Sequence, residues 1–211
     1  MELPGRAILP AVGIPFPWTT CALLAGLLAQ AAPPPATTFS LRVSSAVDEA
    51  GKPLAQAGWL ASEIDAAQAL FAPFGVRFTR TAGAPLDARL AHVETRADRD
   101  AFAAHTTSHV IDVFVVDSLR DVDDSTRTRR GVHWHAPSGA HYLLVVASAQ
   151  TTVLAHELGH YFGNPHSPVV DNVMSYERSG APVFFDADQG KRIAARARTY
   201  VRSGELLPAA P

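Results

Sequence analysis

The segment from His156 to His166 reads H-E-L-G-H-Y-F-G-N-P-H and combines three histidines with one carboxylate. On a helix, His156 and His160 lie one turn apart on the same face, so both rings can reach a single ion. Glu157 then lies close enough to activate a water molecule without ligating the metal itself. Catalytic zinc typically has three protein ligands and a fourth position for water, and His166 supplies the third ligand. The segment predicts a hydrolytic zinc site with Glu157 as the general base.

Gly163 provides the turn that returns His166 to the ion. A helix that continued beyond His160 would carry His166 away from the metal. Glycine at the end of a helix adopts positive φ at no steric cost and turns the chain sharply. Pro165 then opposes any return to helix, because its ring removes a backbone donor and fixes φ. We therefore expect the active-site helix to end near Gly163.

This pattern, together with the turn that follows it, resembles the metzincin clan of zinc endopeptidases. The clan pattern is H-E-x-x-H-x-x-G-x-x-H followed by a methionine-containing turn, and every specified position matches. The turn here is D-N-V-M-S-Y, and its methionine is the only one besides Met1. The resemblance implies zinc ligation by His156, His160 and His166, general base catalysis by Glu157, an apolar floor beneath the metal from Met174, and stabilisation of the oxyanion by Tyr176.

Within the clan, the chain looks like a small bacterial pappalysin-like or matrixin-like form. Ser167, directly after the third histidine, is similar to matrixins, while Phe185 and Gln189 are more similar to pappalysin-type or serralysin-type enzymes. Pappalysin-type proteins usually carry a longer, cysteine-bearing insert before the methionine. In this chain the seven residues 167–173 contain no cysteine, which leaves the family within the clan open.

Composition indicates one small enzyme domain. With 211 residues, 47% of them hydrophobic and 18% charged, the chain has material for a single core. The net charge of -2 lacks the basic excess that nucleic-acid binding requires, so we expect no nucleic-acid partner. We expect a monomer that acts on a peptide or protein substrate.

The first residues predict export. The stretch between Arg6 and Arg42 contains no charged residue, and an apolar run from Cys21 ends in A-Q-A, a small-x-small cleavage pattern at residues 29–31. We expect a signal peptide at 1–31, a Pro-rich spacer at 32–38, a catalytic domain at 39–204 and a C-terminal tail at 205–211. The protein would be secreted or periplasmic, with no membrane attachment after cleavage. The alternative is an uncleaved membrane anchor, for which the apolar run is short.

The remaining periodicity predicts an α+β fold that holds the site. We expect a twisted, mostly parallel mixed sheet with an active-site helix, a backing helix and a C-terminal helix. The backing helix has an apolar stripe formed by Leu60, Ile64, Ala67, Phe71 and Phe74. The expected strands are 39–47, 76–81, 110–116 and 142–147, and the expected helices are 54–74, 96–105 and a final helix capped by Asp186.

The segment 131–137 alternates like an edge strand. In metzincins an edge strand above the zinc binds the substrate backbone, and the resemblance therefore implies substrate contacts from His133, Trp134 and His135. His133 and His135 would share one face of the strand. With His141 and the aspartates within 121–124, they form a candidate for a second, structural metal. The alternative is a polar, partly exposed strand with ordinary histidines.

The function that these features predict is a secreted, zinc-dependent endopeptidase. One alternative is a zinc-binding module without catalysis, although the glutamate and all ligands of the motif are present. Another is a zinc hydrolase of narrow specificity, such as a cell-wall peptidase, because pocket shape rather than the ligand set selects the substrate. By the same resemblance, segments 167–170 and 177–183 line the pocket for the residue after the scissile bond, and their side chains suggest an apolar preference.

Overall fold

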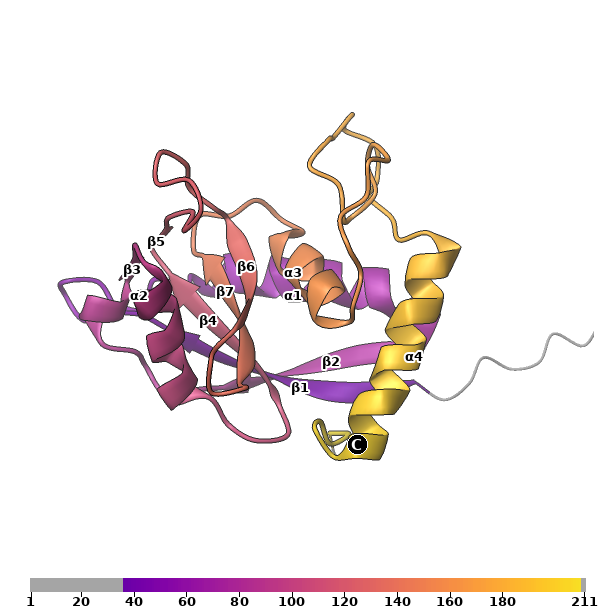
Figure 1. The fold of residues 1–211 in the computed structure, drawn as a ribbon, viewed down its shortest axis with the longest axis horizontal. Coiled ribbons are helices and arrows are strands. Elements are labelled where there is room, and N and C mark those ends of the chain that lie inside the picture. Colours follow the sequence, from indigo (N-terminus) through magenta and orange to yellow (C-terminus); the bar gives the residue numbers. More distant parts are fainter. Residues whose placement is uncertain (1–35, 210–211) are drawn as a thin grey trace, which may run out of the picture. The chain divides into compact units, whose positions relative to one another are not determined.

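The structure is a computed structural model that describes residues 36–209 (Figure 1). The expected signal peptide at 1–31, residues 32–35 of the spacer and the last two residues lie outside this range. Short 3-10 helices lie at Ala72–Phe74 and Phe102–His105. The strands are β1 (Thr37–Ser45), β2 (Val76–Ala82), β3 (His92–Val93), β4 (Ile111–Val116), β5 (Ser118–Leu119), β6 (Gly131–His135) and β7 (His141–Val146), and the helices are α1 (Ala57–Phe71), α2 (Arg96–Ala101), α3 (Val153–Tyr161) and α4 (Ala187–Ser203).

A five-stranded sheet carries the fold, with strand order β2-β1-β4-β7-β6. The first four strands in this order pair in parallel, and β6 pairs antiparallel with β7 at the edge. The predicted mostly parallel mixed sheet is thus confirmed, as is the edge strand, which ends at His135 rather than at residue 137. Every residue of β4 is buried, as expected for a central strand covered on both faces.

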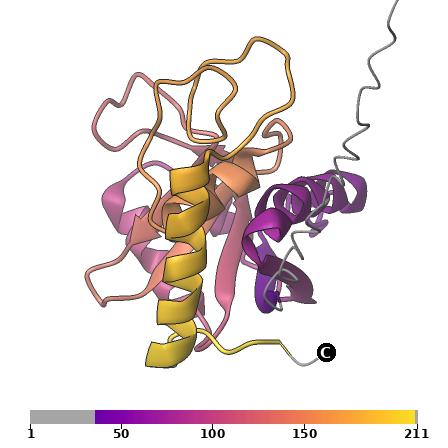
Figure 2. The same ribbon diagram turned by 90° about the vertical axis from the view of Figure 1, so that its right-hand side faces the viewer.

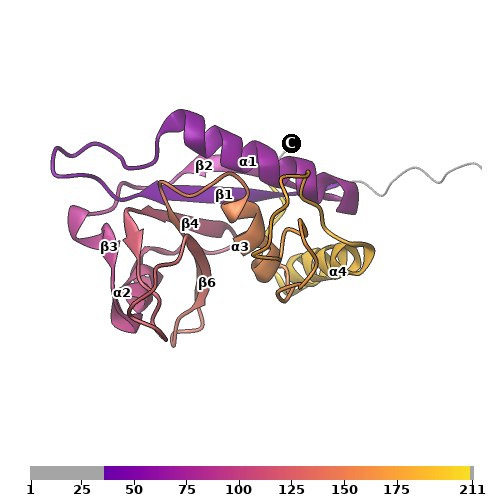
Figure 3. The same cartoon turned by 90° about the horizontal axis from the view of Figure 1, so that it is seen from above.

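Helices cover both faces of this sheet. On one face, Leu41, Val113 and Leu143 pack in a single core with residues of α1, α3 and α4. On the other face, Phe114 and Leu144 belong to a second core with residues of the short β3–β5 pair and of the 3-10 helix Phe102–His105. Figure 3 shows α1 and α2 on opposite sides of the sheet. Because successive side chains of a strand point to opposite faces, β4 and β7 contribute to both cores.

Helix α1 is the predicted backing helix. It begins at Ala57, three residues later than expected, and Pro73 converts its last turn into the 3-10 helix before Gly75 adopts a φ of 75°. Three stripe residues, Leu60, Ala67 and Phe71, are buried. Glu63 lies on the same stripe and is fully buried, which the apolar pattern did not suggest.

Helix α4 begins at the predicted cap. The side chain of Asp186 accepts a hydrogen bond from the backbone of Gln189, whose side chain accepts one from the Asp186 backbone. Figure 2 shows the α3–α4 loop rising above the N-terminal end of this helix. Within residues 36–209, no helix combines the length and apolar character needed to cross a bilayer.

Residues 205–209, which we expected as a C-terminal tail, pack on the domain. Leu206 is buried, and the backbone of this segment bonds to Tyr200, His109 and Thr38. The physical reason is that one apolar side chain and several backbone donors find partners on the domain, which offsets the entropy lost by ordering the segment. Glu205 is thereby held against the sheet.

Candidate metal centre

The three histidines of the motif converge at the end of α3. The Nε2 atom of His160 lies 3.2 Å from that of His156 and 3.1 Å from that of His166. Helical spacing places the first two on one face, and Gly163, with a φ of 85°, turns the chain so that His166 comes back to them. Helix α3 ends at Tyr161, close to the predicted position.

Backbone carbonyls fix the orientation of two of these rings. His156 Nδ1 lies 2.7 Å from the Val173 carbonyl, and His160 Nδ1 lies 2.8 Å from the Asn164 carbonyl. A carbonyl only accepts, so each Nδ1 carries the proton and each Nε2 presents a lone pair to the cluster. Burial also lowers the pKa of His156 to about 4, which favours the neutral, ligating form.

This arrangement fits a zinc ion. Nitrogens that occupy corners of a tetrahedron about 2.0–2.1 Å from one ion lie roughly 3.3 Å apart. The two Nε2 separations have this size, and carbonyl partners on the outer ring nitrogens are the usual support for metal-ligating histidines. His156, His160 and His166 are therefore the residues that would hold the ion.

Glu157 is buried next to this cluster. A side chain at Gly131, the first residue of β6, would lie 2.8 Å from the Glu157 carboxylate, so only glycine leaves room for it. Burial raises the pKa of Glu157 to about 8, and a hydrogen bond from the His133 backbone and the charge of Arg129 partly oppose this shift. A carboxylate with a pKa near neutrality is suited to take up and release a proton.

Met174 lies fully buried beneath α3, where its sulfur packs against Gly159. The buried side chains of Asn172 and Gln189 exchange two hydrogen bonds, of 2.8 and 3.0 Å, and Asn172 also accepts from the Met174 backbone. The methionine turn is thus tied to the first turn of α4. Arg178 closes it from the outside by donating to carbonyls of the turn.

Tyr176 lies beside the third histidine. Its hydroxyl is 2.8 Å from His166 Nε2 and 3.4 Å from a guanidinium nitrogen of Arg129. The side chain is otherwise largely exposed, with 68% of its surface accessible. The hydroxyl is therefore at the open side of the cluster, where a substrate oxygen would approach.

Glu63 supports the active-site helix from α1, a role that sequence reasoning missed. Helix α3 lacks a side-chain cap of its own, since Thr152 at the N-cap adopts a φ of 92° and makes no capping bond. Instead, the buried Glu63 carboxylate accepts a 2.9 Å hydrogen bond from the Leu154 backbone. Burial raises its pKa to about 7. The signal in the sequence was a carboxylate between Leu60 and Ala67 on an apolar stripe.

The predicted substrate-binding residues separate onto two faces of β6. His133 and His135 point toward α3, where His133 packs on Tyr161 at 5.1 Å between ring centroids. Burial, followed by the nearby His135 and His141, lowers the pKa of His133 to about 2. Trp134 turns to the other face, where its indole donates to Asp100 and Arg99 stacks on the ring.

A cavity of about 840 Å³ extends around the free edge of β6. It is lined both by the motif residues His156, Glu157 and His160 and by the edge-strand residues. The catalytic candidates and the free strand edge therefore face the same open space.

The aspartates predicted as ligands of a second metal lie apart from the three histidines. Within residues 36–209, the cluster around His133, His135 and His141 includes none of the aspartates expected at 121–124. Asp121 pairs instead with Arg129 at 2.6 Å, and Asp123 pairs with Arg96. Arginines on neighbouring segments compensate these carboxylates, so they do not reach the histidines.

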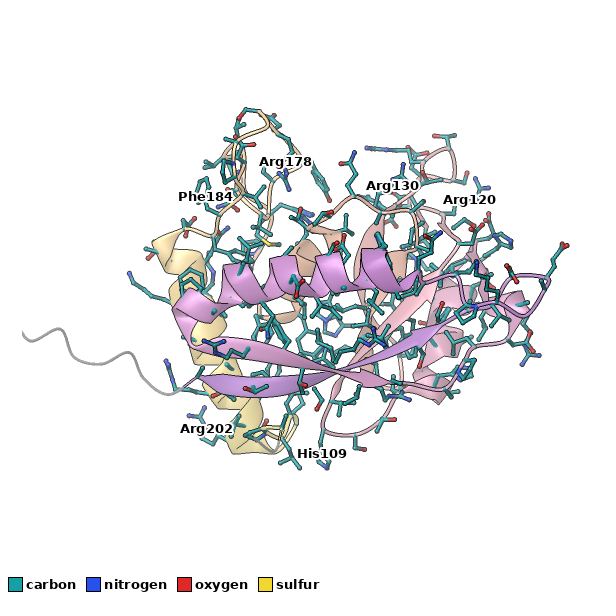
Figure 4. All side chains as sticks on the ribbon, turned by 180° about the vertical axis from the view of Figure 1, so that it is seen from behind. His109, Arg120, Arg130, Arg178, Phe184 and Arg202 are labelled. Carbon is teal, nitrogen blue, oxygen red and sulfur yellow. The ribbon has the colours of Figure 1, made fainter. Side chains whose placement is uncertain are left out.

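A second cavity lies beside the site. This cavity of about 450 Å³ adjoins Glu157, and of the two expected segments only 177–183 reaches it, through Arg178 and Val183. Arg127, Arg129 and Arg130 line it as well, so the cavity is basic. Arg130 and Arg178 lie on separate segments at the same end of the domain (Figure 4). The apolar preference of the substrate pocket stays a prediction.

The parallel sheet, its antiparallel edge strand and the helix that carries the histidines define a metalloprotease fold. Among solved structures, metalloproteinase-II from Bacteroides fragilis has a TM-score of 0.53 at 16% identity, over 78% of this chain and 55% of that one. Archaemetzincin from Methanopyrus kandleri also gives 0.53 at 16%, over 76% and 96%. This chain thus spans little more than half of the Bacteroides protein. No family model and no curated protein matches the sequence.

Proposed function

We propose that this protein is a secreted zinc-dependent endopeptidase of the metzincin type. The observation that carries the proposal is the convergence of three histidine Nε2 atoms beside a buried carboxylate, at the free edge of a sheet. The likeness of the fold to two metalloproteases supports it. Secretion rests on the signal-peptide pattern at residues 1–31 alone.

The free edge of β6 would hold the substrate in extended form. Its outer backbone groups have no neighbouring strand in the five-stranded order, so a peptide can add to the sheet there. The scissile bond would then lie over the cluster, between Glu157 and Tyr176. A bound zinc ion would supply Lewis acidity toward the carbonyl and toward a water molecule.

The side chains then divide the remaining work. Glu157, buried beside the cluster, takes the proton of the attacking water in its carboxylate form and passes that proton to the leaving amine. Tyr176, assisted by Arg129, donates to the developing oxyanion from the open side of the cluster. His156 and His160 stay neutral and fixed through their carbonyl partners.

The test is proteolysis of a denatured protein mixture, read by mass spectrometry, with the Glu157→Gln variant beside the unchanged chain. We expect new internal cleavages that disappear with the variant and with a chelator, while the variant retains its zinc. Glu49→Gln, at an exposed loop position, is the matched control and should cleave normally. Cleavage by Glu157→Gln at the normal rate would exclude this role for the glutamate.

A further inference from the structure

A second group of three histidines lies in the wall of the same cavity, outside the predicted catalytic cluster. It consists of His133 and His135 on β6 and His141 on β7. One nitrogen from each ring lies within 4.8 Å of the others. The rings are packed rather than splayed, because Tyr161 of α3 stacks on His141 with 4.3 Å between centroids and an angle of 11°.

Glu205 determines which nitrogen of His141 faces the group. His141 Nε2 lies 2.7 Å from the Glu205 carboxylate, which in its charged form only accepts, so this nitrogen carries the proton. In a neutral ring, Nδ1 is then unprotonated, and it lies 3.0 Å from His133 Nε2. A carboxylate that holds one ring nitrogen of a histidine, so that the other turns toward a metal, is the usual outer support of metal ligands.

One separation within this group, between His133 Nε2 and His141 Nδ1, matches those of the first cluster. The distance of 3.0 Å between His133 and His141 is close to the 3.1 and 3.2 Å separations of the motif histidines. All three are near the roughly 3.3 Å expected for two corners of a tetrahedral zinc site. His135 is the exposed member, so a fourth position can open toward the cavity.

The nitrogen donors of this group favour a transition-metal ion. Imidazole nitrogens suit zinc, copper and nickel, whereas magnesium and calcium require oxygen ligands. Glu205 is the carboxylate that bonds to a ring of the group, and it contacts His141 from outside the cluster. The group therefore provides three neutral nitrogen donors with one outer carboxylate.

We propose that His133, His135 and His141, oriented by Glu205, form a second binding site for a divalent transition-metal ion. The ion links β6 to β7 and presents a free coordination position to the active-site cavity, while Glu205 connects His141 to the segment after α4. This site is separate from the proposed catalytic one and does not depend on peptidase activity. The competing arrangement is a chain of histidines that hydrogen-bond to one another without an ion.

The test is the number of zinc ions bound per chain, measured by mass spectrometry after equilibration in a zinc buffer. The unchanged chain should bind about two ions, and His135→Ala and His160→Ala about one each. His92→Ala, an exposed histidine outside both groups, is the matched control and should bind about two. Circular dichroism establishes that each variant is folded.

Glu205→Gln provides a graded readout that leaves all three ligands in place. This variant should lower the affinity for the second ion on the order of 10- to 100-fold and leave the affinity for the first ion unchanged. Both affinities are measured by competition with a chelator. This inference is overturned if the unchanged chain binds one ion and this ion is lost in His160→Ala but retained in His135→Ala. That result would preserve the proposed function. If the unchanged chain binds one ion that is lost in His135→Ala and retained in His160→Ala, the second site is supported and the first is refuted.

Discussion

Gly159→Ala tests the packing beneath the metal centre. A Cβ atom at this position would lie 2.3 Å from the sulfur of Met174, 3.2 Å from its methyl carbon and 3.3 Å from a ring carbon of Phe185. Met174 is fully buried, so its sulfur cannot move aside without displacing the floor of the site. Contacts under 3.0 Å therefore require the methionine turn to shift.

The size of the effect follows from two opposing contributions. Replacing glycine by alanine in an unobstructed helix stabilises it by up to about 1 kcal/mol. Inserting a methyl group into a close-packed core costs about 1–3 kcal/mol. We therefore expect Gly159→Ala to lower the free energy of unfolding by up to about 2 kcal/mol, and to weaken zinc binding because Val173, next to Met174, holds the His156 ring.

Gly58→Ala is the matched control, because a Cβ atom at this position of α1 meets nothing within 4 Å. Urea denaturation gives the free energy of unfolding of both variants, and competition with a chelator gives their zinc affinities. The Gly159→Ala/Met174→Ala double variant tests whether the contact with Met174 causes the loss of stability. Its loss in free energy of unfolding should be smaller than the sum of the losses of the two single variants. If Gly159→Ala is as stable as Gly58→Ala and binds zinc normally, the close packing described here is refuted.

Three further predictions concern the surroundings of the site. Folding raises the pKa of Glu63 from 4.5 to about 7, so ionisation of Glu63 favours the unfolded chain. As the pH rises through this interval, the free energy of unfolding of the unchanged protein should fall by about 3 kcal/mol relative to Glu63→Gln. Urea titrations of both proteins at several pH values measure this difference. Thr152→Gly should stabilise the domain by about 1 kcal/mol in the same assay, because a β-branched residue at a φ of 92° is strained. Arg130→Glu should reduce cleavage before acidic residues, measured on a peptide library, because Arg130 helps to make the cavity beside Glu157 basic; an unchanged profile would contradict this.

Local patterns in the sequence were sufficient for the main elements and for the grouping of the three motif histidines. The spacing of His156 and His160 depends only on helix geometry, and the turn at Gly163 only on which residue tolerates positive φ. The alternation of residues 131–135 and the mostly apolar sequence of β4 likewise indicated an edge strand and a central strand. These features are encoded within a few residues of one another, which is why they can be read from the chain.

Contacts between segments far apart in the sequence were decided by the tertiary structure alone. Glu63 lies 91 residues from the helix end that it caps, and Glu205 lies 64 residues from His141. The sequence offered the aspartates within 121–124 as metal ligands, but the fold pairs two of them with arginines. The burial of Leu206 in the expected tail likewise depends on the fold. No local periodicity records such pairings, because they depend on how the sheet and helices pack.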